Sequence, residues 1–98
     1  MTILHIEHPI NDFSVWQAAF AGFAARRRQG GVRGERVSRP IDDERYVVID
    51  LDFDSPGDAS QFLEFLRTEV WANPQRSPGL AGSPSTRILE AADLGPAE

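Results

Sequence analysis

The stretch HIEHPINDFSVWQAAF, residues 5–20, lies where a strand pattern gives way to a helix pattern. Residues 2–8 alternate in the way that a strand with two different faces does. One face of this strand would carry Ile3, His5 and Glu7, and the other Leu4, Ile6 and His8. The helix is expected to begin after Asp12, whose carboxylate can accept from the free amides of the first turn, and to run to about residue 29. The stretch therefore predicts a strand followed directly by a helix.

Four further elements follow in the sequence. They are a polar edge strand over residues 32–39, an apolar strand over 45–53, a helix from Ser55 to Asn73–Pro74, and a strand over 86–91. The order β-α-β-β-α-β predicts an α+β, ferredoxin-like fold, with two helices on one face of a four-stranded antiparallel sheet. Right-handed connections place strands 2–8 and 45–53 in the centre. We expect residues 1–92 to form one domain and 93–98 a flexible tail.

The face of the sheet away from the helices is more apolar than a solvated face needs to be. It would carry Ile3, His5, Tyr46 and Val48 beside Glu7, Asp50 and Asp52. Burial against a second copy would cover it, and a chain of 98 residues has only a thin core of its own. We therefore expect a homodimer closed as a dimeric α/β barrel, with His5, Tyr46, Asp50 and Asp52 in the interface.

The composition excludes several kinds of chemistry. The chain has no cysteine and no lysine, which removes thiolate nucleophiles, thiolate metal sites, Schiff bases and the P-loop lysine. Only two histidines are present, so no metal site and no cofactor are expected. The net charge of −5 argues against nucleic acid as a partner.

The sequence also predicts a location for the protein. No run approaches the roughly 20 apolar residues of a membrane span, and the first residues lack the pattern of a signal peptide. We expect a cytoplasmic protein with no membrane partner. A chain rich in Ala and Gly whose basic residues are all Arg is typical of a GC-rich bacterial genome.

Three segments resemble the dimeric α/β-barrel superfamily, and together they cover most of the chain. They are HIEHPINDFSVWQAAF (5–20), RVSRPIDDERYVVIDLDFDS (36–55) and GLAGSPSTRILE (79–90). The resemblance is to the antibiotic biosynthesis monooxygenase-like group, many of whose members have no assigned activity. It implies a ferredoxin-like dimer with a cavity between helices and sheet. Haem-degrading relatives place a ligating His on the second helix, and no His follows position 8 here, so that mechanism is rejected.

The candidate catalytic residues are His8, His5 and Asp12. His8 could pair with Asp12, either to fix the strand-to-helix turn or as a general base that titrates near neutrality. His5 shares a sheet face with Asp50 and Asp52, where such a contact could orient a base or stabilise a dimer interface. Alternation separates the two histidines, so they cannot form one site.

The candidate substrate-binding residues are Trp16, Phe20, Phe62 and Trp71, which could line a cavity for a small aromatic ligand or simply form the core. Arg76 and Arg87 could anchor an anionic substrate, although exposure to solvent is the ordinary state of such residues. Arg26–Arg28 is expected to be a solvated helix end.

The leading interpretation is a homodimer with a small-molecule pocket, most similar to a cofactor-independent monooxygenase that uses His8 or His5 as the base. The alternative is a non-enzymatic ligand-binding or structural dimer. The sequence contains no nucleophile elbow, phosphate loop, zinc motif or dinucleotide-binding fingerprint that would decide between them.

Overall fold

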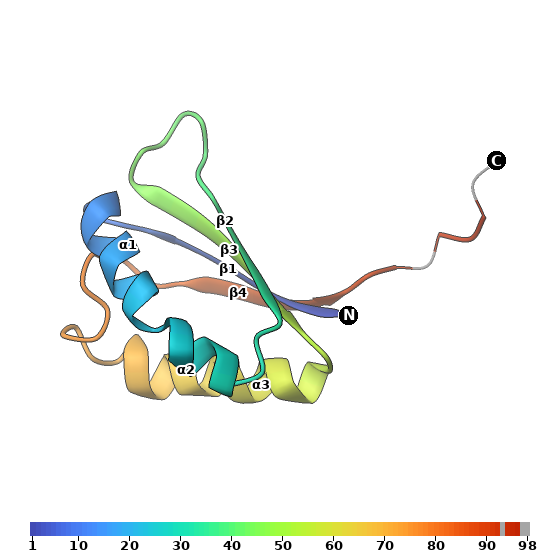
Figure 1. Cartoon of the computed structure of the whole chain (residues 1–98). Helices are drawn as coiled ribbons and strands as arrows, with labels where there is room; N and C mark the ends of the chain where they lie inside the picture. The colour runs from blue at the N-terminus through green and yellow to red at the C-terminus, as the bar shows by residue number, and fades with distance from the viewer. Residues whose placement is uncertain (93, 97–98) are drawn as a thin grey trace.

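The computed structural model describes residues 1–92 and 94–96. Figure 1 shows its helices packed together on one side of a twisted sheet. The elements in chain order are β1 (Thr2–Pro9), α1 (Phe13–Gly22), α2 (Ala24–Gln29), β2 (Gly34–Ser38), β3 (Tyr46–Phe53), α3 (Pro56–Phe65), the π-helical turn η1 (Leu66–Val70) and β4 (Ser85–Glu90). The tail expected to be flexible, 93–98, lies partly outside the described residues, because 93, 97 and 98 are not among them.

The four strands form one antiparallel sheet in the order β2-β3-β1-β4. β1 and β3 are central, as expected from their apolar runs. Their register pairs His5 with Asp50, while on its other side His5 lies opposite Arg87 of β4. The predicted α+β, ferredoxin-like βαββαβ fold is confirmed.

The core lies between the sheet and the helices. Strict alternation along β1 and β3 sends every second side chain to the helical side, where it is buried. The buried apolar side chains of these two strands are Leu4, Ile6, Val47, Ile49, Leu51 and Phe53, and they meet Trp16, Ala59, Phe62 and Leu63 from the helices. The predicted division of both strands into two faces is correct.

The first helix differs from its prediction. A single helix was expected up to residue 29, but the chain breaks at Phe23, which adopts φ −98° and ψ 11° between α1 and α2. Gly22 just before the break weakens the helix. The Phe20 carbonyl accepts from the amide of Phe23 and from the guanidinium of Arg27. The break rotates α2 relative to α1 and decides which of the three consecutive arginines is buried.

The second helix begins as expected and ends differently. The Ser55 hydroxyl accepts from the amide of Asp58 at 3.2 Å, and Pro56 occupies the first turn. The last turn is widened, because the amide of Trp71 donates to the carbonyl of Leu66, five residues back, at 2.7 Å. The widened turn leads to Trp71, which lies against the core.

Candidate functional site

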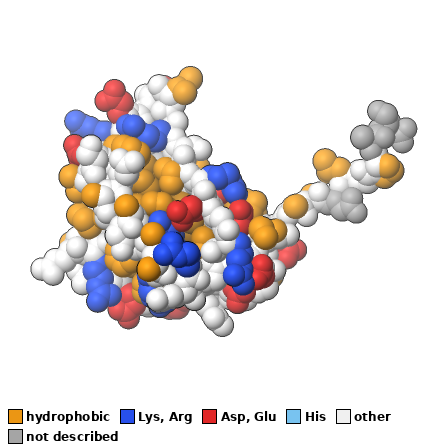
Figure 2. All heavy atoms as spheres, viewed as in Figure 1, with side chains coloured by type: hydrophobic (Ala, Val, Ile, Leu, Met, Phe, Trp, Pro, Cys, Tyr) orange, Lys and Arg blue, Asp and Glu red, His pale blue; other side chains and the backbone are white. Residues whose placement is uncertain are grey.

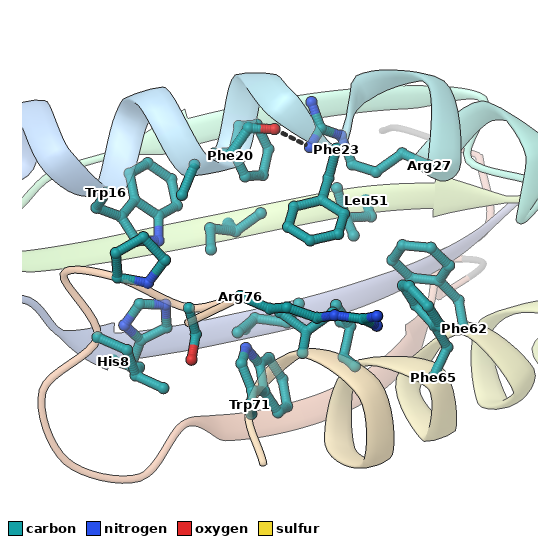
Figure 3. A pocket seen from close by; sticks show the side chains of 18 residues that line it. His8, Trp16, Phe20, Phe23, Arg27, Leu51, Phe62, Phe65, Trp71 and Arg76 are labelled. Atoms are coloured by element: carbon teal, nitrogen blue, oxygen red, sulfur yellow. Dashed lines mark hydrogen bonds between the residues drawn. The ribbon is translucent and has the colours of Figure 1, made fainter. Parts of the chain in front are cut away.

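A cavity of about 80 Å³ lies between the helices and the sheet. Figure 3 shows the labelled side chains entering it from both layers. Most of its lining is aromatic or aliphatic. The four predicted substrate-binding residues, Trp16, Phe20, Phe62 and Trp71, all line it. The structure adds Phe23, Phe65, Leu66, Val70, Pro78 and Leu80 to this lining, and these were not predicted to do so. Loop 75–85 gave no periodic pattern from which its side of the cavity could be inferred.

His8 is a buried polar group of this cavity, with 2% of its surface exposed. Its Nδ1 lies 2.8 Å from the carbonyl oxygen of Pro9. A carbonyl only accepts, so Nδ1 carries the proton. Burial lowers the pKa of His8, and the imidazole is therefore neutral at pH 7. Nε2 is left with a free lone pair.

The lone pair of His8 Nε2 opens into the cavity. Among the described residues, no fully buried side-chain nitrogen or oxygen lacks a hydrogen-bond partner, and Nδ1 makes the hydrogen bond of this ring. Because Nε2 makes no hydrogen bond and is not a fully buried atom, it must be accessible, and the ring to which it belongs lines the cavity. A group in this position can accept a hydrogen bond or a proton from a bound molecule.

The expected pairing of His8 with Asp12 is wrong. The Asp12 carboxylate accepts from the amide of Val15 at 3.0 Å and caps α1 at the surface. Its local hydrogen bond holds it beside the first turn, as capping residues are held. The ring that approaches His8 is Trp16, with ring centroids 6.2 Å apart in an edge-on arrangement. Asp12 therefore starts the helix and contributes nothing to His8.

A row of stacked groups runs along α1, and three of them, Trp16, Phe20 and Arg27, line the cavity. We call Arg39, Phe13, Trp16, Phe20 and Arg27 the α1 stack. Trp16 and Phe20 lie with centroids 5.0 Å apart, and an arginine covers each end, Arg39 over Phe13 and Arg27 over Phe20. The other side of the stack lines a groove between α1 and β2. Figure 2 shows hydrophobic side chains gathered on this face of the molecule, with charged side chains among them.

Arg27 was expected to be solvated and is instead buried, with 5% of its surface exposed. Its guanidinium donates to the carboxylate of Glu35 and to the Phe20 carbonyl, and lies 3.7 Å from the centre of the Phe20 ring. A buried guanidinium is stable only when its donors are satisfied in this way. Arg27 thus joins α2 to β2 and fixes the aromatic wall.

Arg76 also lines the cavity, as one of the two predicted anion anchors. Its side chain is 51% exposed, and its contacts with Glu69 are long, 3.3 Å to the carbonyl and 3.4 Å to the carboxylate. The other predicted anchor, Arg87, is exposed on β4 opposite His5, on the face of the sheet away from the cavity. Only Arg76 of this pair lies at the site.

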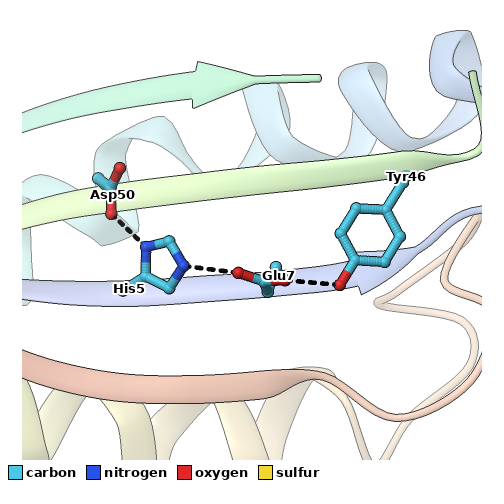
Figure 4. Close-up of polar contacts among 4 residues, drawn as sticks. All are labelled: His5, Glu7, Tyr46 and Asp50. Atoms are coloured by element: carbon cyan, nitrogen blue, oxygen red, sulfur yellow. Dashed lines mark hydrogen bonds and ion pairs between the residues drawn. The ribbon is translucent and has the colours of Figure 1, made fainter. Parts of the chain in front are cut away.

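The opposite face of the sheet holds a chain of polar side chains, which we call the outer-face network and which Figure 4 shows. Nδ1 of His5 lies 2.7 Å from Asp50, Nε2 of His5 lies 2.8 Å from Glu7, and the Tyr46 hydroxyl donates to Glu7 at 2.8 Å. Carboxylates only accept, so both nitrogens of His5 carry protons. The bond to Glu7, and then that to Asp50, raises the pKa of His5.

The network confirms one predicted contact and removes another. His5 does meet Asp50, but Asp52 lies opposite Ile3 and pairs with Arg36 of β2 at 2.8 Å. That guanidinium lowers the pKa of Asp52. The two histidines lie on opposite faces of the sheet, as predicted. His8 lines the cavity, and His5 belongs to the outer-face network.

Two features are absent from the described residues. No group of three or more His, Cys, Asp or Glu side chains there is placed to hold a metal ion. Within residues 1–92 and 94–96, no helix has the length and apolar character needed to cross a membrane.

Comparison with known proteins finds likeness in structure. No family model matches the chain, and no curated protein matches it in sequence. A provisionally named antibiotic biosynthesis monooxygenase of Bordetella bronchiseptica superimposes with a TM-score of 0.68 at 13% identity, over 93% of this chain and 97% of its own. Another antibiotic biosynthesis monooxygenase superimposes with a TM-score of 0.66 at 10% sequence identity, over 95% of this chain and 100% of its own. A dimeric ferredoxin-like protein of an uncultured marine organism superimposes with a TM-score of 0.61 at 6% sequence identity, over 99% of this chain and 100% of its own.

Two of these neighbours carry the name of the group that the sequence resembles, and the third is described as a dimeric ferredoxin-like protein. At such low identities they speak for the fold alone, and they agree with the four-stranded antiparallel sheet and its helical layer.

Proposed function

We propose that the protein binds a small, electron-rich aromatic molecule in the cavity and oxidises it with O₂ without a cofactor, using His8 as the general base. The observation that carries this proposal is the buried ring of His8 in the lining of an aromatic cavity, with Nδ1 bonded to the Pro9 carbonyl and Nε2 not used in a hydrogen bond within the fold. Burial lowers the pKa of this imidazole, which favours its neutral form. His5 lies on the far side of the sheet, so it is not the base of this site. The names of the structural neighbours agree with this class of reaction.

The chemistry needs only the substrate and O₂. Nε2 of His8 takes a proton from an aromatic hydroxyl, and the resulting anion gives electrons to O₂ more readily than the neutral ring does. A hydroquinone supplies every electron required: with one O₂ it yields a hydroxyquinone and one water, so no external reductant takes part. Trp16 and Phe20 provide flat surfaces for the ring. The apolar lining keeps water from the anion.

Filling the cavity tests this proposal. Ala19 lines the cavity from α1, so Ala19→Phe should place a ring where the ligand would lie. We expect hydroquinone binding, measured by calorimetry under nitrogen, to fall at least tenfold, and O₂ uptake to stop. Ala18→Phe is the matched control, because Ala18 is exposed on the same helix. Binding without O₂ uptake by the parent protein would instead support a non-enzymatic ligand-binding protein, and equal binding by both variants would place the ligand elsewhere.

We also propose that the protein is a homodimer joined through the outer face of the sheet, with His5, Tyr46, Asp50 and Asp52 in the interface. Four apolar or aromatic side chains lie on this face, and Ile3, Tyr46 and Val48 are only partly exposed even in a single chain, while Leu89 is 40% exposed. Two of the structural neighbours are described as dimeric ferredoxin-like proteins. A second sheet packed on this face would close a barrel.

The outer-face network predicts how pH acts on this surface. The pKa of His5 is raised in the folded protein, so its contribution is full below the pKa of an unfolded histidine and is lost as pH rises through the folded value. Around the ring stand Glu7 on β1, Asp50 on β3 and Arg87 on β4, with Tyr46 and Arg36 one contact further out.

We expect the parent protein to lose roughly 1 kcal/mol of unfolding free energy relative to His5→Gln between pH 6 and 9, a modest amount because the ring is partly exposed. Urea unfolding across that range measures the difference, and sedimentation measures the accompanying loss of dimer. The pKa of His8 is lowered rather than raised, but His8 is present in both proteins, so its contribution to the pH dependence cancels in the comparison. Parallel pH curves for the two proteins would refute the coupling.

A further inference from the structure

The charged side chains that line the cavity have the sign opposite to the net charge of the protein. The chain carries a net charge of −5, but the described residues that line the cavity include two arginines and no aspartate or glutamate. A guanidinium in such a lining can pair with a carboxylate of a bound molecule. The lining therefore offers cations but no carboxylate to a ligand.

The two arginines are not equivalent. Arg27 is buried and its charge is balanced by Glu35, so its donors are already used within the fold. Arg76 is half exposed and meets the Glu69 carboxylate only at 3.4 Å, with both side chains open to water. Exposed pairs of this kind contribute little. Arg76 is thus the cation of the site that can turn to a ligand, and Figure 3 shows its side chain extended along the cavity.

The size of the cavity limits the ligand. A volume of about 80 Å³ has room for on the order of six water molecules, since each requires roughly 10–15 Å³. The six carbons of one aromatic ring match such a space. The part of the ligand held between the aromatic side chains is therefore expected to be one ring, with any further group at the cavity opening.

We propose that the ligand is a single-ring hydroquinone that carries a carboxylate, with a hydroxyl donating to Nε2 of His8 and the carboxylate paired with Arg76. This inference rests on the proposed function, of which it specifies the substrate class. A guanidinium can bind both carboxylate oxygens at once, and this pairing of two hydrogen bonds fixes the orientation of the ligand. Arg76 then acts as the specificity-determining residue, and His8 as the group that receives the proton.

Binding under nitrogen tests the proposal without turnover. We would titrate the full chain with 2,5-dihydroxybenzoate and with hydroquinone, which differ by the carboxylate alone, and measure heat of binding. The parent protein should bind the carboxylate about tenfold more tightly. In Arg76→Gln the two ligands should bind with equal affinity, because the preference depends on the pairing of the carboxylate with Arg76. Arg33→Gln is the control, because Arg33 is similarly exposed, holds Asp54 at 2.9 Å and lies outside the cavity lining.

The outcomes separate the two proposals. If hydroquinone binds and the carboxylate brings no advantage, or if the advantage survives in Arg76→Gln, the role of Arg76 is overturned while the cavity stays a ligand site. If 1,4-naphthalenediol binds more tightly than hydroquinone, the single-ring limit is wrong. If none of the three binds, the proposed function fails together with this inference. Loss of the preference in Arg33→Gln as well would indicate a general charge effect and also overturn the assignment.

Discussion

Replacing His8 by Asn should reduce turnover of a hydroquinone by about 10²–10⁴-fold, the usual contribution of a general base. The amide of Asn can still donate to the Pro9 carbonyl as Nδ1 does, whereas nothing replaces Nε2 in the cavity. The variant should therefore lose its base and keep its local structure. O₂ uptake with hydroquinone measures the rate, and thermal unfolding measures the fold.

The pH profile distinguishes a base from a merely structural residue. A general base works when it is unprotonated, and burial lowers the pKa of His8 below its usual value. The rate of the parent protein should therefore be constant from neutral pH upward and fall only in acid, while the residual rate of His8→Asn should not follow that titration. A variant that unfolds several degrees earlier and keeps its turnover would instead give His8 a structural role.

Replacing Arg27 by Ala should destabilise the protein by about 2 kcal/mol, which in a domain of this size lowers the melting temperature by roughly 10 °C. The substitution removes the hydrogen bonds to Glu35 and Phe20 and the cation that covers the end of the α1 stack. The cost stays below that of a fully buried pair, because Glu35 is partly exposed and water can reach it. Calorimetric unfolding measures the change.

Arg28→Ala is the matched control, since Arg28 is the next residue of the same helix and is exposed. We expect its unfolding free energy to lie within about 0.5 kcal/mol of the parent value. The aromatic wall predicts a second consequence: loss of Arg27 should loosen Phe20 and weaken ligand binding, and loss of Arg28 should do neither. Equal destabilisation by the two substitutions would contradict the arrangement described for Arg27.

The fold could be predicted from the sequence because its signals are local. Alternation in residues 2–8 and 45–53 assigns each side chain to a face, and the caps at Asp12 and Ser55 mark where the helices begin. Trp16, Phe20 and Phe62 could be placed beside the sheet for a similar reason, since large aromatic side chains at helical spacing point to the sheet.

The remaining features depend on contacts between distant segments. Three consecutive arginines give no sign of which one is buried, because that depends on the break at Phe23 and on a partner in β2. The partner of His8 was missed because a ring bonded to the neighbouring carbonyl leaves no trace in the sequence pattern. The place of Arg76 depends on an irregular loop, whose path only the whole fold decides.

The widened turn between α3 and Trp71 accommodates a residue without redirecting the indole. Such a turn holds about one residue more than an ordinary helical turn. Loss of one residue from Leu66–Val70 would restore regular winding and place Trp71 four steps of about 100° after Leu66, which is nearly the direction that five steps of the wider turn give it now. The sheet, both caps and the buried strands would be unaffected. Close relatives of this chain could therefore gain or lose the widened turn by insertion or deletion of a single codon and keep both the fold and the indole wall.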